Sequence, residues 1–202
     1  MLSEDEIRYK VTQTVYTGGC DEAGAGCWSG DLLVAAVILD PNNPIVGLND
    51  SKKLSEKKRE ELYPQIIEKA LDYCIIHISP QEIDDSNILA CRMDGMRRAI
   101  EGLKRIDYAI IDGNRLPKGL TVEANYIIEG DAKFEAIGAA SILAKVTRDR
   151  MITEQAKLYP QYGFEKHKGY GTKIHMEALA IHGPCIIHRM SYKPVKNSIK
   201  TR

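Results

Sequence analysis

The sequence predicts an α/β protein, because strand-like and helix-like segments alternate along most of its 202 residues. Hydrophobic residues make up 44% and charged residues 28% of the chain, which is ordinary for a globular domain with a substantial core. The sequence contains no internal repeats and no low-complexity tracts. These features indicate one large domain, or one domain with a small appendage.

Two neighbouring strands are predicted near the start of the chain, over residues 13–21 and 32–39. The second is continuously apolar, which is typical of a strand buried on both faces. A helix is predicted to begin after Ser55, a residue that commonly caps helices. Apolar residues then recur every four positions from Leu62 to Ala70, which indicates the buried face of that helix.

A third strand, over residues 73–78, precedes the predicted start of a long amphipathic helix. Ser79, Pro80 and Glu82 form the pattern of a capping box with proline at the first helical position. Apolar residues with a 4-3-4-3 spacing then predict one continuous buried helix face. This face consists of Leu89, Met93, Met96, Ile100 and Leu103.

The second half of the chain continues the alternation. Strands are predicted over residues 107–112 and 121–129. A helix over 136–157 is rich in small residues, which would let it pack closely against a sheet. A further helix is predicted over 173–182, where Gly183 ends it, and the tail beyond is basic.

Charge is distributed unevenly along the chain, although the formal net charge is zero. From residue 157 to residue 202 there are nine Lys or Arg residues and two acidic residues, which gives +7 there and −7 over residues 1–156. This asymmetry indicates either an acidic site with a basic C-terminal arm, or opposite charges that pair within one fold. Composition alone leaves both interpretations open.

The cellular location is predicted from cysteine usage and from apolar patterning. The five cysteines are odd in number and scattered without a CxxC pair, which favours reduced thiols over disulfides or a zinc site. No apolar run approaches the roughly 20 residues needed to span a membrane. The N-terminal segment is acidic and lacks the apolar core of a secretory signal. We therefore expect a cytoplasmic protein that does not bind membranes.

Acidic residues lie at or just beyond the ends of three predicted strands, namely Asp21 and Glu22, Asp112, and Asp131. Ligands gather at strand ends in α/β sheets, so these carboxylates are expected to form a cluster. Like charges repel in such a cluster, and divalent cations would neutralise them. Carboxylates without His or Cys favour Mg²⁺ or Mn²⁺, and four can hold two ions for phosphoryl displacement. The alternative is that these acids are solvated surface residues.

Longer blocks of the sequence resemble one family, bacterial ribonuclease HII. They occur in the order of that family over about residues 14–198 and comprise 21–26, 48–57, 111–114, 130–131, 139–149, 162–172 and 191–196. The resemblance implies a ribonuclease H-like fold, with a mixed β-sheet flanked by helices and a small helical C-terminal part. The corresponding division is a catalytic domain over residues 1–172 and a basic helical extension over 173–202 that packs on the same domain.

The resemblance also implies an activity. The enzyme would hydrolyse the phosphodiester on the 5′ side of a ribonucleotide, leaving a 3′-hydroxyl and a 5′-phosphate. Its substrates would be RNA–DNA hybrids and duplex DNA with embedded ribonucleotides. Asp21, Glu22, Asp112 and Asp131 would be the catalytic carboxylates and would bind Mg²⁺ or Mn²⁺. No oligomer interface is evident in the sequence, so a monomer is expected.

Substrate choice is expected to depend on the 2′-hydroxyl, which separates a ribonucleotide from a deoxyribonucleotide. By resemblance, the loop of Gly24, Ala25 and Gly26 presents backbone groups to that hydroxyl, and Tyr170 checks the DNA–RNA junction. The family usually has arginine at the position of Ala25, so phosphate affinity or junction preference would be weaker here. Candidate contacts to backbone phosphates are Lys52, Ser141, Lys145, Lys166 and Lys168.

Two other classes of function remain open at this point. The same fold would also suit a catalytically silent duplex-binding protein, although a binder has no use for clustered repulsive charge. A metal phosphatase or a general DNA nuclease would use similar acids, but would not need the glycine loop and Tyr170 together. An ordinary helix-surface role for Lys145 and a packing role for Tyr170 are likewise open.

Overall fold

The computed structural model describes residues 2–48 and 54–200, which are built around a five-stranded sheet in the order β3-β2-β1-β4-β5. Its strands are β1 (Thr17–Ala23), β2 (Leu32–Ile38), β3 (Asp72–Ile78), β4 (Tyr108–Asp112) and β5 (Ala124–Ile127). Neighbours are antiparallel on the β3-β2-β1 side and parallel on the β1-β4-β5 side. The predicted α/β class with a mixed sheet is therefore confirmed.

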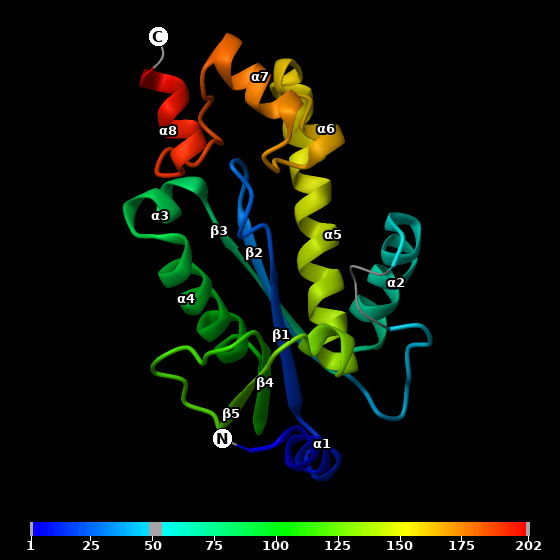
Figure 1. Ribbon diagram of the computed structural model, residues 1–202. Helices are drawn as coiled ribbons and strands as arrows, with labels where there is room; N and C mark the ends of the chain where they lie inside the picture. Colours follow the sequence, from blue (N-terminus) through cyan, green and yellow to red (C-terminus); the bar gives the residue numbers. More distant parts are fainter. Residues whose placement is uncertain (1, 49–53, 201–202) are drawn as a thin grey trace.

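Helices cover both faces of this sheet (Figure 1). On one face, α5 (Glu135–Leu158) packs on β1 and β2, with α2 (Glu56–Lys69) beside it. On the other face, α4 (Ile88–Glu101) packs on β1, β2 and β3. β2 lies between these two layers, so all seven of its residues are buried, as its apolar run predicted.

Close contact between α5 and β1 depends on glycine. A Cβ atom at Gly19 would lie 2.2 Å from the backbone carbon of Ala136 at the start of α5. Farther along the helix, the small buried residues Ala139 and Ala140 pack in one cluster with residues of β2. The long central helix therefore lies directly against the strand that carries Asp21 and Glu22.

The remaining helices lie at the two ends of the sheet. They are α1 (Glu4–Gln13), α3 (Pro80–Asp85), η1 (Gly130–Ala132), η2 (Pro160–Tyr162), α6 (Phe164–His167), α7 (Lys173–His182) and α8 (Lys193–Lys200). The last three gather at one end, opposite α1 (Figure 1). There Phe164, Leu179 and Val195 form a small apolar cluster with Ile152 and Ala156 of α5. Among the described residues, no helix combines the length and apolar character needed to cross a bilayer.

The first predicted strand is wrong in its boundaries. Its first predicted residue, Gln13, is the last residue of α1, and β1 begins only at Thr17. α1 begins with a capping box between Ser3 and Glu6, the same pattern that correctly predicted the start of α3. Because β1 continues to residue 23, the acids at 21 and 22 lie within the strand.

The predicted long helix after Ser79 is also wrong, because it is two helices. The backbone breaks at Ser86, with φ −129° and ψ −108°, and Asn87 caps a new helix by accepting a hydrogen bond from the N–H of Ala90. Met96 and Ile100 are fully buried as predicted, but Leu89 is 43% exposed. The apolar spacing continued across the break and concealed it.

Other elements agree closely with the predictions. Ser55 caps α2, and α5 and α7 differ from the expected ranges by at most one residue at each end. β5 is shorter than its predicted range of 121–129. Part of the recognised block at 48–57, including Lys52, lies outside the described residues.

Candidate active site

Three of the four predicted carboxylates line one small pocket, of about 250 Å³. Asp21 and Glu22 come from β1, and Asp112 comes from the parallel neighbour β4. Cys20 pairs with Ile111 in the register of these strands, so the acids that follow them lie side by side. The other residues that line the pocket are Ala23, Gly24, Ala25, Arg59, Ser141, Lys145 and Tyr170.

The fourth carboxylate, Asp131, is 3% exposed and does not line this pocket. It belongs to η1, which follows β5. The backbone N–H of the preceding Gly130 donates a 2.7 Å hydrogen bond to Oδ1 of Asp112. That bond joins the two segments that carry Asp112 and Asp131. Asp131 therefore directly follows a residue that is hydrogen-bonded to the cluster.

Electrostatics in the pocket disfavour the ionised acids. Asp21 is only 4% exposed, and burial raises the pKa of its carboxyl group well above its usual range. The charges of Glu22 and Asp112 raise it further, while a hydrogen bond with Ser141 lowers it. Burial also raises the pKa of Glu22, although Arg92 opposes this shift. These carboxylates are therefore held together against their mutual repulsion.

Arg92 of α4 is a site residue that sequence reasoning missed. Its Nε lies 2.8 Å from Oε1 of Glu22, but its N–H is not aligned with that oxygen, so the contact is an ion pair. The other oxygen of Glu22, Oε2, is buried and accepts no hydrogen bond in the described part of the chain. The available signal was the spacing, because Arg92 precedes the core residue Met96 by one helical turn.

The carboxylates fit a hard divalent cation in chemistry, but their side chains have not converged on one point. Among the described residues, no three acidic, histidine or cysteine side chains are arranged to hold an ion as they stand. Glu22 is turned toward Arg92, and Asp112 accepts its hydrogen bond from Gly130. The set is made of carboxylates alone, and the buried Oε2 of Glu22 lacks a donor, as expected for an Mg²⁺ or Mn²⁺ site.

A glycine turn forms one wall of the pocket. The N–H of Cys27 donates to the carbonyl of Gly24 at 3.2 Å, which closes a turn with Ala25 and Gly26 at its corners. Gly24 has φ +96°, and a Cβ atom there would lie 2.1 Å from Nε of Arg148, so this position requires glycine. Gly24 and Ala25 line the pocket, and Gly26, the next residue of the turn, is exposed.

Tyr170 lies across the pocket and is 42% exposed. Its segment is tied to the glycine turn, because the N–H of Trp28 donates to the carbonyl of Gly169 at 2.9 Å. The ammonium group of Lys145 lies 5.5 Å from the centre of the Tyr170 ring. An aromatic face and a cation therefore stand together at the edge of the acidic pocket.

The predicted phosphate contacts fall into two groups. Ser141 and Lys145 of α5 line the pocket, and Lys145 also bonds to Asp149 at 2.9 Å. Lys166 and Lys168 do not line it, and the ammonium group of Lys168 donates instead to the hydroxyl of Thr153 at 2.8 Å. Sequence proximity to Tyr170 did not indicate where these two lysines point.

Two buried arginines, Arg148 and Arg189, were also missed. Arg148 of α5 donates to the backbone carbonyls of Ser29, Asp31 and Lys168. Arg189 donates to the carbonyls of Ala25 and Gly30. Among the described residues, neither guanidinium group has a carboxylate within ion-pair distance. Sequence gave no signal for this arrangement, because arginine is seldom fully buried.

A chain of buried histidines lies beneath the Tyr170 segment. The N–H of Cys185 donates to Nδ1 of His188 at 2.9 Å, so the proton of His188 resides on Nε2. That nitrogen is 3.0 Å from Nε2 of His175, whose Nδ1 lies 3.0 Å from the carbonyl of Tyr170. This order of donors requires both imidazoles to be neutral, and burial lowers the pKa of each to about 4.

His167 is buried beside this chain of histidines. Its Nε2 is 2.8 Å from the carbonyl of Tyr162, and the N–H of Gly169 donates to its Nδ1 at 3.2 Å. Its ring stacks on that of His175 with centroids 4.5 Å apart. These contacts fix the backbone that leads to Tyr170.

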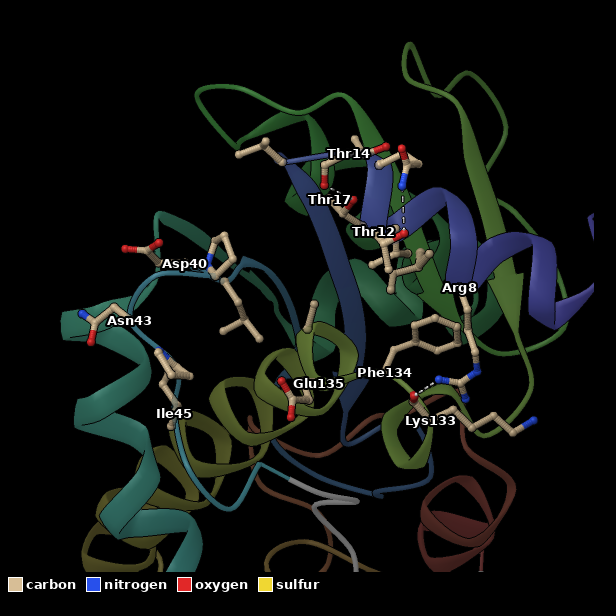
Figure 2. Close-up of a pocket in the computed structure, with 18 residues that line it drawn as sticks. Arg8, Thr12, Thr14, Thr17, Asp40, Asn43, Ile45, Lys133, Phe134 and Glu135 are labelled. Atoms are coloured by element: carbon tan, nitrogen blue, oxygen red, sulfur yellow. Dashed lines mark hydrogen bonds between the residues drawn. The ribbon is translucent and has the colours of Figure 1, made fainter.

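A larger pocket, of about 850 Å³, lies at the other end of β1. Figure 2 shows it between α1, the loop that follows β2 and the start of α5. The guanidinium group of Arg8 lies 4.6 Å from the ring centre of Phe134 and donates to the carbonyl of Lys133. None of the predicted site residues lines this pocket, and its size alone does not identify it as the active site.

Comparisons with known proteins identify relatives of this chain. The sequence model of the family described as Ribonuclease HII matches residues 18–195. The ribonuclease HII of Marinomonas sp. (strain MWYL1) is 54% identical over 183 residues, which cover 90% of this chain and 92% of that protein. The ribonuclease HII of Vibrio parahaemolyticus is 56% identical over 182 residues, which cover 90% and 86%.

A solved structure supports the fold. The crystal structure of the ribonuclease H2 from Pyrococcus horikoshii OT3 matches with a TM-score of 0.78 and 28% identity, covering 92% of this chain and 97% of that chain. The mixed sheet with helices on both faces is therefore the ribonuclease H-like fold that the resemblance implied. Fold, family model and close relatives agree, and the chain belongs to the ribonuclease HII family of enzymes.

Proposed function

We propose that this enzyme is an endonuclease that cuts on the 5′ side of a ribonucleotide and leaves a 3′-hydroxyl and a 5′-phosphate. Its substrates are RNA–DNA hybrids and duplex DNA with embedded ribonucleotides. One observation carries the proposal: Asp21, Glu22 and Asp112 meet in a pocket walled by a glycine turn and Tyr170. Family membership supports ribonuclease H activity in general, and the pocket supports this more specific form.

Asp21, Glu22, Asp112 and Asp131 are the residues that would hold Mg²⁺ or Mn²⁺. Two such ions, when bound, lower the pKa of an attacking water and stabilise the leaving oxygen. The raised pKa of Asp21 supports this assignment, because buried acids that repel one another gain most from a cation. The unsatisfied oxygen of Glu22 supports it as well.

Other residues of the pocket bind and orient the nucleic acid. The backbone of the glycine turn lies where it can approach a sugar closely, because two of its three residues have no side chain. The half-exposed ring of Tyr170 offers an apolar face for the sugar at the junction. Lys145 places a positive charge beside that ring for a backbone phosphate.

Location and assembly are proposed from simpler observations. All five cysteines are free thiols, which is usual in a reducing compartment, so we propose that the protein acts in the cytoplasm. We propose that it acts as a monomer, and light scattering on the purified protein would test this. The division of the chain at residue 172 remains a prediction that limited proteolysis would test.

One gel distinguishes the proposal from the two alternative classes. The protein is incubated with Mg²⁺ or Mn²⁺ and a duplex DNA that carries a single ribonucleotide, next to the same duplex made entirely of DNA. We expect cleavage only on the 5′ side of the ribonucleotide. A mobility shift without cleavage would indicate a binding protein, and cleavage of the all-DNA duplex would indicate a general nuclease. An Asp131→Asn variant, which should keep the fold, serves as the inactive control.

A further inference from the structure

The peptide group between Ala25 and Gly26, at the corner of the glycine turn, is held from behind by two side chains. The hydroxyl of Tyr192 donates a 2.6 Å hydrogen bond to the carbonyl of Ala25. Nη1 of Arg189 lies 3.2 Å from the same carbonyl and also donates to the Tyr192 hydroxyl at 3.0 Å. Both side chains come from the C-terminal segment, more than 160 positions away.

This anchoring fixes the direction of the Gly26 N–H group. No peptide bond in the described part of the chain is cis, and a planar trans peptide directs its N–H opposite to its carbonyl. Because the carbonyl points inward to Arg189 and Tyr192, the N–H of Gly26 points away from them. Among the described residues this N–H donates to no backbone acceptor outside helices and strands. Nothing lies within 4 Å of the position that a Gly26 Cβ would occupy, so a ligand can approach.

Charge behind the turn strengthens that donor. Arg189 is fully buried, and its hydrogen bonds within the described residues go to two backbone carbonyls and one tyrosine hydroxyl. A cation that bonds to a carbonyl polarises the whole peptide group, and hydrogen bonds in such a chain reinforce one another. The N–H of Gly26 is therefore a better donor than an ordinary exposed amide.

We propose that Tyr192 and Arg189 are positioning residues for ribonucleotide recognition, which orient and polarise the Ala25–Gly26 peptide so that Gly26 N–H donates to the 2′-hydroxyl. The inference rests on the proposed function and deepens it. It also explains how the turn can work with alanine at position 25, because the recognition runs through the backbone and needs no side chain there.

The test uses Tyr192→Phe, which removes one hydroxyl and keeps the ring. Ser191→Ala is the matched control, because Ser191 binds Asp84 on α3 and makes no hydrogen bond to the turn. For each protein, kcat and KM are measured on a duplex with one ribonucleotide. The all-deoxy duplex of the same sequence is added as a competitive inhibitor to obtain its Ki. Thermal unfolding is recorded for all three proteins.

We expect Tyr192→Phe to lower kcat/KM for the ribonucleotide duplex by roughly three- to tenfold, the effect of one hydrogen bond, with Ki for the all-deoxy duplex unchanged. Ser191→Ala should match the wild type in both quantities. The proposal is overturned if Ki rises in step with the loss of kcat/KM, if Ser191→Ala behaves alike, or if Tyr192→Phe has no effect. Failure of the proposed function looks different, because the wild-type enzyme itself would then not cut the ribonucleotide duplex.

Discussion

Buried charged groups lie on both sides of the glycine turn, and the two sides differ in how far the fold satisfies those groups. On the pocket side, Asp21 and Glu22 are crowded acids whose pKa values are raised, and the buried Oε2 of Glu22 accepts no hydrogen bond from the described residues. On the inner side, Arg148 and Arg189 donate hydrogen bonds to backbone carbonyls. The arginines are satisfied by the fold, whereas we propose that the acids are left for a ligand. In this proposal the first region binds, and the second, the holding region, keeps the binding surfaces in place.

Removing an acid from the pocket should lower activity and raise stability. Asp21→Asn is expected to lower kcat by roughly 10²–10³-fold, because an essential cation ligand is lost. In EDTA at pH 7 the same variant should unfold with a free energy higher by on the order of 1 kcal/mol, because a buried repulsive charge is gone. Activity assays and urea unfolding measure the two effects. A variant that is both active and less stable would contradict this interpretation.

Removing a buried arginine, in contrast, should lower the stability of the fold. Arg148→Ala leaves one buried and two partly buried carbonyls without their donors and is expected to lower the free energy of unfolding by roughly 3–5 kcal/mol. Arg150→Ala is the matched control on the same helix, because Arg150 forms an exposed ion pair with Glu60 and should cost less than about 1 kcal/mol. Equal losses in urea unfolding would show that Arg148 has no special holding role.

Acid should lower the free energy of unfolding through the buried histidines His175 and His188. The pKa of His175 and of His188 is about 4 in the folded protein, against about 6.5 when unfolded, so the unfolded chain binds more protons between these values. Stability should therefore fall as pH decreases from about 6.5 to 4, by up to about 1.4 kcal/mol per pH unit for each histidine.

The acidic pocket should act in the opposite direction. Because the pKa of Asp21 is raised in the folded state, its contribution to stability is lost as pH increases. In urea unfolding with EDTA from pH 7 to 4, Asp21→Asn should consequently lose stability more steeply than the wild type, and His188→Gln less steeply. If the free energy of unfolding changes with pH in parallel for the three proteins, the predicted opposite effects of Asp21 and the histidines are wrong.

The smallest expected effect concerns the departure at position 25. Ala25→Arg adds a cation beside the pocket and should lower KM on a junction duplex by roughly two- to fivefold, the strength of one exposed charge contact. The effect should weaken at higher salt. An unchanged KM at low salt would mean that the arginine usual in the family adds no phosphate contact in this protein.

The two regions also differ in how far the sequence predicted them. The acids at 21, 22 and 112 could be found, because strand patterns and the register of parallel strands bring their ends together. The break at Ser86 was missed because the apolar spacing outweighed the capping residue Asn87, and α1 was missed although Ser3 and Glu6 carry the pattern of a capping box. In both cases a local cap decided the boundary.

The contacts of the buried arginines and histidines could not be predicted in the same way. Four of the five carbonyls to which Arg148 and Arg189 donate lie more than 100 positions away, and no periodicity marks such partners. The histidine chain joins Cys185, His188, His175 and the Tyr170 carbonyl through the folding of the C-terminal helices. The sequence contains these residues, but only the tertiary structure determines which of them meet.

Cation binding tests the central claim most directly. Thermal unfolding of the wild type and of Asp112→Asn is recorded with increasing MnCl₂, without nucleic acid. A ligand that binds only the folded state stabilises it by about 2.7 kcal/mol at a hundred times its Kd, so the wild-type Tm should rise with metal and saturate. The variant should show little rise. If the wild-type Tm does not respond to Mn²⁺, or if both proteins respond equally, the carboxylate cluster is not a cation site.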